Sequence, residues 1–268
     1  MTQPFGQRLA AAVGARGPLC VGIDPHAPLL EKWGLPDSPD GLARFTDSVV
    51  DALAGSVAVL KPQAAFYERH GSRGLAVLED GVARARAAGA LVLLDAKRGD
   101  IGSTMDAYAD YLRPDHPLAV DAMTVSPYLG PGSLQPAVDT ARAHGGGLFV
   151  LARTSNPDAG TLQLVGKPSV AQQVVDTVRG WNAGTAAGSF GVVVGATLGE
   201  LDVDLTGLNG PVLAPGLGAQ GGSPEDLRRL FDAGTVVVPT VSRDVLAAGP
   251  DVAALRAAAE RWAGALAA

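Results

Sequence analysis

The sequence predicts an α/β fold, a single-domain (β/α)8 TIM barrel covering residues 1–268, and three observations support this prediction. Eight short apolar runs recur along the chain. Most of these runs are apolar at successive positions, which is typical of parallel strands that are buried on both faces. The segments between them are mostly rich in alanine and carry Arg, Asp and Glu at helical spacing, so a helix is expected after each strand.

The predicted strands are bounded by turn-forming residues such as Gly, Pro and Asp. In chain order they cover residues 18–24, 56–62, 90–97, 122–128, 147–154, 190–197, 211–216 and 235–243. Helical patterns are clearest at residues 9–15, 74–88 and 250–266. An open doubly wound sheet is the alternative, but the first run ends in Gly-Ile-Asp-Pro rather than in a glycine-rich nucleotide turn. No linker, repeat or shift in composition divides the chain, which favours one domain.

Composition and charge exclude several classes of partner. The chain has 21 basic and 27 acidic residues, a formal net charge of −6 and 5% aromatic residues. Nucleic-acid binding usually needs a basic surface and aromatic stacking platforms, so no nucleic-acid partner is expected. No apolar run approaches the roughly 18 residues of a membrane span, and residues 9–15 suit an amphipathic helix better than a signal peptide. We therefore expect a cytoplasmic protein with no membrane partner.

Metal ligands and disulfides are not indicated. The single cysteine, Cys20, is expected to be a small buried residue on a strand. The four histidines show no metal-ligand spacing, and no cysteine pair exists. No metal site is predicted.

Polar residues stand at the ends of several predicted strands. In a barrel of this kind the chemistry lies at the C-terminal ends of the strands. These residues are Asp24 on the first strand, Lys61 on the second, Asp95 and Lys97 on the third, Ser126 on the fourth, Arg153 and Ser155 on the fifth, and Arg243 on the eighth. We expect them to surround the open end of the barrel.

The lysines at these strand ends indicate proton transfer or covalent chemistry. The chain has only four lysines against seventeen arginines, yet Lys61 and Lys97 both stand there. A desolvated lysine can release a proton, whereas arginine does not do so in proteins. Asp95 and Lys97 are two residues apart on a strand and so point to one face, and Asp100 follows in the next loop. The spacing D-x-K-x-x-D therefore predicts a charged cluster at the barrel opening.

The string DAKRGDI, which contains this cluster, resembles the most specific motif of the orotidine 5′-phosphate decarboxylase family. Four further strings support the resemblance in order along the chain: VGID, LKPQAAFYE, LARTSNP and PGLGAQGG. The strings TVSPYLG and PTVSRDV look more like the longer bacterial branch of the family. The resemblance covers essentially the whole sequence.

The resemblance implies decarboxylation of orotidine 5′-monophosphate to uridine 5′-monophosphate and CO2, the last step of UMP biosynthesis, with no metal and no organic cofactor. It implies that Lys97 gives a proton to C6 of the pyrimidine. Asp95 and Lys61 would complete the charged array. Asp100 would act in the site of the neighbouring subunit, so the resemblance implies a homodimer.

The resemblance also implies which residues bind the substrate. Asp24 and the partner's Thr104 would bind the ribose hydroxyls, Ser155 would read the pyrimidine edge, and Gln220 and Arg243 would hold the phosphate. Further substrate-binding residues are Ile101, Pro215 and Ser242, the last through nearby backbone N–H groups. Many family members have Gly where this chain has Ser242. Residues 215–226 form a glycine-rich candidate lid, and Ser126, Tyr128 and His26 are expected to pack in the core or in loops rather than to react.

Three alternatives remain open at this point. A related barrel enzyme could act on a sugar phosphate with Mg²⁺, but such relatives carry an acidic metal ligand where this chain has Lys61, which would repel the ion. A Schiff-base aldolase could use Lys97. A non-catalytic sensor could retain the nucleotide-phosphate pocket. Such a sensor would gain little from buried carboxylates beside an anionic ligand.

Overall fold

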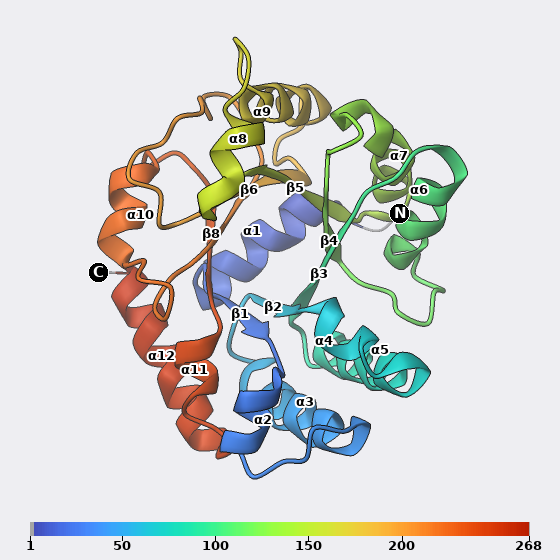
Figure 1. Cartoon of the computed structure of the whole chain (residues 1–268), viewed down its shortest axis with the longest axis vertical. Helices are drawn as coiled ribbons and strands as arrows, with labels where there is room; N and C mark the ends of the chain where they lie inside the picture. Colours follow the sequence, from blue (N-terminus) through green and yellow to red (C-terminus); the bar gives the residue numbers. More distant parts are fainter. Residues whose placement is uncertain (1–2, 268) are drawn as a thin grey trace.

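The computed structural model describes residues 3–267 and confirms the predicted fold class (Figure 1). The first and last residues of the predicted domain, 1–2 and 268, lie outside the described residues. The strands are β1 (Cys20–Ile23), β2 (Val59–Pro62), β3 (Leu91–Arg98), β4 (Ala122–Val125), β5 (Gly147–Arg153), β6 (Phe190–Val194), β7 (Val212–Pro215) and β8 (Val237–Val241). They pair in chain order, all in parallel, and β8 pairs with β1, which closes the barrel.

Helices surround the barrel. They are α1 (Phe5–Arg16), α2 (Ala27–Lys32), α3 (Pro39–Leu53), α4 (Ala64–Glu68), α5 (Gly71–Ala87), α6 (Gly102–Ala109), α7 (Gln135–His144), α8 (Gly160–Gln163), α9 (Val170–Trp181), α10 (Pro224–Leu230), α11 (Arg243–Leu246) and α12 (Val252–Ala267). Short 3₁₀ turns lie at Asp110–Leu112, Pro131–Leu134 and Pro157–Ala159. The three helical patterns seen in the sequence correspond to α1, α5 and α12.

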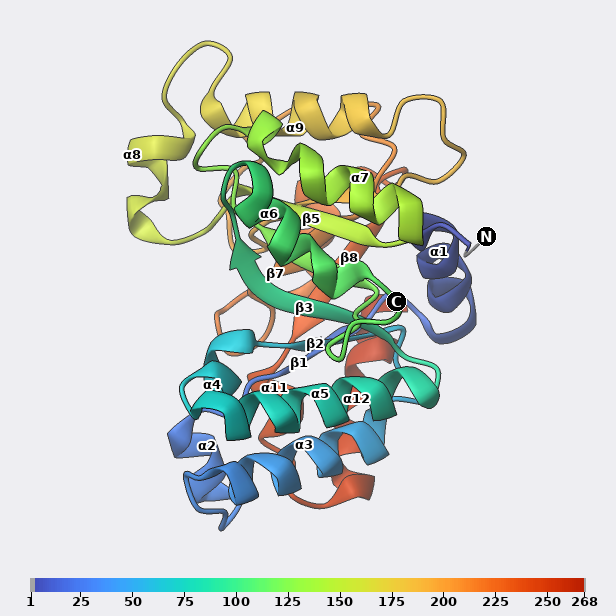
Figure 2. The same cartoon turned by 90° about the vertical axis from the view of Figure 1, so that its right-hand side faces the viewer.

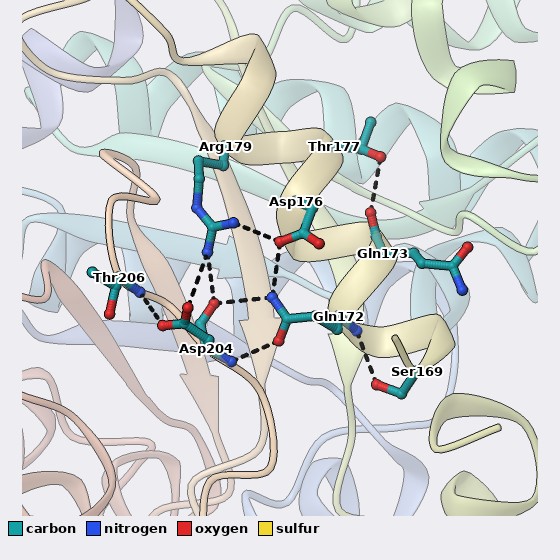
Figure 3. Close-up of polar contacts among 8 residues, drawn as sticks. All are labelled: Ser169, Gln172, Gln173, Asp176, Thr177, Arg179, Asp204 and Thr206. Atoms are coloured by element: carbon teal, nitrogen blue, oxygen red, sulfur yellow. Dashed lines mark hydrogen bonds and ion pairs between the residues drawn. The ribbon is translucent and has the colours of Figure 1, made fainter. Parts of the chain in front are cut away.

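The expected alternation of strand and helix is broken once, between β6 and β7. Residues 195–211 form no helix, because four glycines interrupt the segment at short intervals and each is unfavourable inside a helix. Side chains of α9 hold this connection in place (Figure 3). The backbone N–H of Asp204 donates to Gln172 Oε1 at 2.7 Å, and Arg179 Nη2 donates to the Asp204 carbonyl at 2.8 Å. Leu198, Val203 and Leu208 of this connection are buried in the core, so apolar packing and the polar network together hold it against the barrel.

Several predicted strands extend too far at their C-terminal ends. Ser126 lies one residue beyond β4, Ser155 two residues beyond β5, and Arg243 opens the short helix α11 instead of ending β8. The pairing stops where the chain turns outward into the loops, and an apolar run alone does not mark that point. The corrected ends leave these residues at the barrel opening but on loops.

The amino-terminal end of the barrel is covered by α1 (Figure 2). Phe5 and Leu9, each 1% exposed, pack against interior strand residues. The ring of Phe5 lies edge-on to that of Phe149, with centroids 6.0 Å apart. Arg8 pairs with the buried carboxylate of Asp121 and so ties α1 to the start of β4. Because this end is covered, access to the interior is from the carboxyl ends of the strands, which we call the mouth.

Cys20 is a fully buried strand residue, as predicted. Burial raises the pKa of its thiol to about 12, against a lowering influence from Lys61. Within residues 3–267, no helix combines the length and the apolar character that crossing a bilayer requires.

Candidate active site

A cavity of about 300 Å³ opens at the mouth. Polar side chains from seven strands and helices, or from the loops that follow them, line this cavity. They are Asp24, Lys61, Gln63, Asp95, Lys97, Thr124, Gln220, Thr240, Ser242 and Arg243. Apolar side chains, including Leu151, Val193 and Leu213, form its floor. A larger cavity of about 590 Å³ lies near α1 at the other end, but apolar side chains and backbone form most of its wall. The charged cavity at the mouth is the candidate active site.

Asp95 binds both lysines. Its Oδ2 lies 2.8 Å from Lys61 Nζ, and its Oδ1 lies 2.6 Å from Lys97 Nζ. Asp95 is 7% exposed and Lys61 is 5% exposed, whereas the Lys97 side chain is 46% exposed. One buried carboxylate thus holds two ammonium groups, one enclosed and one facing the cavity.

The charges of the cluster reinforce one another. Burial alone would raise the pKa of Asp95, but the attraction of Lys61 and Lys97 outweighs it and holds that pKa well below its ordinary value. Burial would lower the pKa of Lys61, but the attraction of Asp95 and Asp24 outweighs it and raises that pKa. Asp95 is therefore ionised and Lys61 protonated over the whole neutral range.

Lys97 lies in an irregular part of β3. The ladder pairs Leu94 with Met123 and then Arg98 with Val125, so four steps along β3 face two steps along β4. Lys97 has a φ of +49°, in the left-handed region that residues with a Cβ rarely adopt. The prediction that Asp95 and Lys97 share a face is confirmed by their contact, but a bulge rather than regular strand alternation brings them together.

Four of the predicted substrate-binding residues line the other side of the cavity, between the end of β7 and α11: Pro215, Gln220, Ser242 and Arg243. Arg243 makes none of the ion pairs found within residues 3–267, so its guanidinium is available to an anion. The surface pair with Asp244 that would have given it a structural role is not formed.

The glycine-rich segment after β7 has more internal order than its composition indicated. The backbone N–H of Gly222 donates to the carbonyl of Gly216 at 3.0 Å, and that of Gly218 donates to the carbonyl of Gly222 at 2.9 Å. A capping box between Ser223 and Asp226 then starts α10, so the last residues of the predicted 215–226 loop are helical. The non-helical part of the candidate lid is residues 216–223, before α10.

Ser242 lies directly against Gly22 of β1. A Cβ built on Gly22 would come within 1.9 Å of Ser242 Oγ and 2.9 Å of Asp24 Oδ2. The serine side chain therefore occupies space that only a glycine at position 22 leaves free. Asp24 Oδ1 is buried in the same region without a hydrogen-bond partner, which leaves one carboxylate oxygen for a ligand.

Other predicted site residues are not gathered in this cavity. Asp100 follows β3, and its Oδ1 accepts the N–H of Ile101 at 2.7 Å. Ile101 and Thr104 are exposed on the outside of the mouth. Ser155 is also exposed. It nevertheless lies close to the end of β6, since a Cβ built on Gly195 would lie 2.9 Å from Ser155 Cβ. None of these four residues lines the charged cavity of its own subunit.

Gln63, Thr124 and Thr240 line the cavity, and sequence reasoning had not selected them. Gln63 directly follows the Lys-Pro pair that ends β2, a signal that could have been noticed. The two threonines lie within apolar strands and look like ordinary core residues in the sequence. Within residues 3–267, no three His, Cys, Asp or Glu side chains converge in a way that would hold a metal ion.

Fold and site together define a class, a (β/α)8-barrel enzyme with a buried lysine–carboxylate cluster and an arginine in the cavity at the mouth. A model of the orotidine 5′-phosphate decarboxylase / HUMPS family matches residues 17–258, and the chain belongs to this family. The chain is 60% identical over 265 residues to orotidine 5′-phosphate decarboxylase from Salinispora arenicola, which covers 97% of this chain and 95% of that protein.

Two further relatives agree. Identity to orotidine 5′-phosphate decarboxylase from Streptomyces coelicolor is 61% over 267 residues, covering 97% of this chain and 96% of that protein. The crystal structure of a Streptomyces avermitilis protein assigned to the same activity has a TM-score of 0.95 at 60% identity, covering 100% of this chain and 97% of that one. The family resemblance recognised in the sequence is confirmed.

Proposed function

We infer that this chain decarboxylates orotidine 5′-monophosphate to uridine 5′-monophosphate and CO2 in pyrimidine biosynthesis. The observation that carries the inference is the pairing of Asp95 with both Lys61 and Lys97 in the cavity at the mouth. Breaking the bond from C6 to the carboxyl group releases CO2 and leaves an electron pair at C6. The ring cannot delocalise that pair directly, so catalysis depends on a fixed positive charge and a proton source beside it.

Lys97 is the proposed proton donor. Its side chain reaches the cavity and is 46% exposed, whereas Lys61 is enclosed. Attraction to Asp95 and Asp24 raises the pKa of Lys61 and makes it a poor acid. In the step we propose, the Lys97 ammonium gives its proton to C6, the C6–H bond forms, and the resulting amine regains a proton from solvent. Lys61 and Asp95 keep the ammonium in place.

The remaining polar residues of the cavity suit a nucleotide. Arg243 and Gln220 would bind the phosphate, since an arginine fork matches its oxygens and a dianion otherwise meets a chain of negative net charge. The unpartnered Asp24 Oδ1 would accept a ribose hydroxyl. Pro215 and the backbone near Ser242 would complete the phosphate side, and Ser155 would reach the pyrimidine edge from the loop after β5.

We propose that the active enzyme is a homodimer. Asp100 and Thr104 lie outside the charged cavity of their own subunit, which fits a contribution to a neighbouring site. Ile101 is 62% exposed beside them, although it is a large apolar side chain. A single exposed apolar side chain is common, but several on neighbouring loops mark a protein interface.

A second loop extends this apolar surface. Tyr128 and Leu129 are 76% and 52% exposed after β4, so of the two positions expected for Tyr128, core or loop, the structure places it on a loop. The two loops touch, because a Cβ on Gly99 would lie 2.4 Å from the Ser126 carbonyl oxygen. Ile101, Tyr128 and Leu129 therefore lie on two neighbouring loops, and in the proposed dimer a second copy of the chain would cover them.

A metal-dependent reaction on a sugar phosphate is disfavoured by the position of Lys61. A protonated lysine ends β2, and its pKa is raised, so its charge would repel a divalent cation there. The absence of a metal and of an organic cofactor, and a cytoplasmic location, remain predictions.

The test is the ultraviolet absorbance of orotidine 5′-monophosphate mixed with catalytic amounts of the purified chain, with and without EDTA. We expect loss of the substrate band and formation of uridine 5′-monophosphate at the same rate in both. No loss of the band would remove the proposed function. Loss that EDTA abolishes would instead favour the metal-dependent alternative.

A further inference from the structure

We propose that Thr124 is a positioning residue for this reaction, whose hydroxyl fixes the Lys97 backbone and the Asp95 carboxylate so that the Lys97 ammonium points into the cavity. The proposal rests on the proposed decarboxylation. Thr124 lies in the middle of β4, is 1% exposed and lines the charged cavity. Nothing in the reaction chemistry described above uses it.

The hydroxyl of Thr124 completes the irregular ladder between β3 and β4. Between Leu94 and Arg98, β3 has two residues more than β4 can pair with. Lys97 falls in this bulge, and its backbone N–H donates to Thr124 Oγ1 at 2.9 Å. The side-chain hydroxyl therefore takes the place of a backbone acceptor. It also holds Lys97 at a φ of +49°, a conformation that a lysine does not adopt without such support.

The direction of the second hydrogen bond follows from the first. Because the Lys97 N–H donates to the hydroxyl oxygen, the single proton of Thr124 is free to go to the carboxylate. Thr124 Oγ1 donates to Asp95 Oδ1 at 2.8 Å, the same oxygen that binds Lys97 Nζ at 2.6 Å. The two ends of Lys97, its backbone N–H and its ammonium, are thus joined through Thr124 and Asp95 in one closed set of hydrogen bonds.

Removing the hydroxyl would leave the part-buried Lys97 N–H without its acceptor and the buried Asp95 Oδ1 without one of its two donors. The N–H belongs to Lys97, the proposed proton donor. The oxygen belongs to Asp95, whose carboxylate orients the Lys97 ammonium. Among residues 3–267, the Thr124 hydroxyl bonds only Lys97 and Asp95, and it makes no hydrogen bond to Gln220 or Arg243 on the phosphate side of the cavity. The loss should therefore appear in the chemical step rather than in substrate binding.

The experiment compares Thr124→Val, which keeps the shape and removes the hydroxyl, with Thr124→Ser, which keeps the hydroxyl. We expect Thr124→Val to lower kcat about 100-fold, as an ångström-scale misplacement of a reacting group does, with KM and the Kd for uridine 5′-monophosphate nearly unchanged. Thr124→Ser should recover about tenfold or more of that loss. In a crystal structure of Thr124→Val, Lys97 Nζ should no longer lie within hydrogen-bond distance of Asp95 Oδ1.

Thr46→Val is the matched control for a buried hydroxyl. Thr46 is 2% exposed in α3, and its Oγ1 donates to the Leu42 carbonyl at 2.8 Å, far from the cavity lining. This variant should lose stability but keep kcat. If Thr124→Val yields no folded protein, Thr124→Ala is measured by the same criteria.

The proposal is overturned if kcat falls no further in Thr124→Val than in Thr46→Val, or if Thr124→Ser is as impaired as Thr124→Val. An equal loss of substrate binding would also overturn it. Failure of the proposed function gives a different result, because the wild-type chain would then not decarboxylate orotidine 5′-monophosphate at all.

Discussion

Lys61 and Asp95 form a buried ion pair at the base of the charged cavity, with Lys61 Nζ 2.8 Å from Asp95 Oδ2. The carboxylate binds Lys97 through its other oxygen, so each oxygen of Asp95 is matched to one ammonium group. Both partners of the buried pair are almost inaccessible, which leaves Lys97 as the ammonium that a substrate can reach. The pair therefore leaves one enclosed ammonium, that of Lys61, and one that faces the cavity, that of Lys97.

Lys61→Met is expected to destabilise the fold. It leaves the Asp95 carboxylate buried with Oδ2 unpaired, and breaking a buried pair by removing one partner costs about 3–5 kcal/mol. Urea denaturation at neutral pH measures the loss. Lys32→Met is the control, because Lys32 is exposed and its replacement should change the free energy of unfolding little. A Lys61→Met chain as stable as wild type would contradict the role of the pair.

The same pair predicts how stability depends on pH. The pKa of Asp95 is lowered from its ordinary value of 3.8, so its contribution is present above that pH and is lost as the pH falls through the lowered pKa. The pKa of Lys61 is raised from 10.5, so its contribution is present below that pH and is lost as the pH rises through the raised pKa. Between these two limits, the Lys61–Asp95 pair should add no pH dependence to the free energy of unfolding of the wild-type chain.

In Lys61→Met the loss of stability at acid pH should begin at a higher pH than in wild type. Burial, which raises the pKa of Asp95, is then opposed by Lys97 alone. Denaturation curves between pH 4 and pH 7, referred to the Lys32→Met control, measure the shift. A loss of stability that begins at the same pH as in wild type would show that Lys61 does not hold the pKa of Asp95 down.

Gly22→Ala should disturb the phosphate side of the cavity through Ser242. The added Cβ would lie 1.9 Å from Ser242 Oγ, and overpacking of this kind costs about 1–3 kcal/mol of stability. Because Ser242 precedes Arg243, we also expect a raised KM for orotidine 5′-monophosphate. Adding Ser242→Gly removes the colliding side chain and should restore both stability and KM in large part. If the second substitution restores neither, the contact does not position Arg243.

Arg243→Ala should weaken binding of the phosphorylated substrate specifically. Loss of charge-assisted hydrogen bonds to a phosphate is expected to raise KM about 100-fold. Turnover of orotidine, which lacks the phosphate, should be low in both proteins and unaffected by the substitution. Arg73→Ala, on the exposed surface of α5, is the control. Equal loss with the two substrates would place Arg243 outside the phosphate site.

Sharing of residues between subunits predicts complementation. Lys97→Ala and Asp100→Asn chains should each be inactive alone. In a mixed dimer one site would combine an intact Lys97 with an intact Asp100 from the partner, so mixing should restore activity. Lys97→Ala mixed with Asp95→Asn is the control, because both changes fall in one subunit's own cluster and no intact site can form. Activity in the control mixture, or none in the first mixture, would contradict the shared site.

The sequence predicted the barrel because its strands are buried on both faces and so appear as uninterrupted apolar runs. It also predicted that Asp95 and Lys97 lie together, although the two-residue spacing that suggested this belongs to a regular strand. The real arrangement depends on the register between β3 and β4, which is set by pairing across about thirty residues of chain and has no local signature.

Other features were hidden for related reasons. Thr124 looks like one more small residue in an apolar strand, because only the bulge opposite it makes its hydroxyl necessary. The glycines of residues 195–211 were a visible signal against a helix after β6, but the contacts between α9 and Asp204 that hold this connection join segments that are not adjacent in sequence. The exposure of Tyr128 follows from the direction of a loop, and an aromatic side chain in the sequence does not reveal that direction.

The central claim, that Lys97 is the proton donor, is tested most directly by turnover and product binding of Lys97→Ala. We expect turnover of orotidine 5′-monophosphate to fall by about 10³-fold or more, because both the acid and the positive charge at C6 are lost. Binding of uridine 5′-monophosphate should remain measurable by calorimetry, since Arg243, Gln220 and Asp24 are retained. A Lys97→Ala chain that keeps substantial turnover would contradict the assignment.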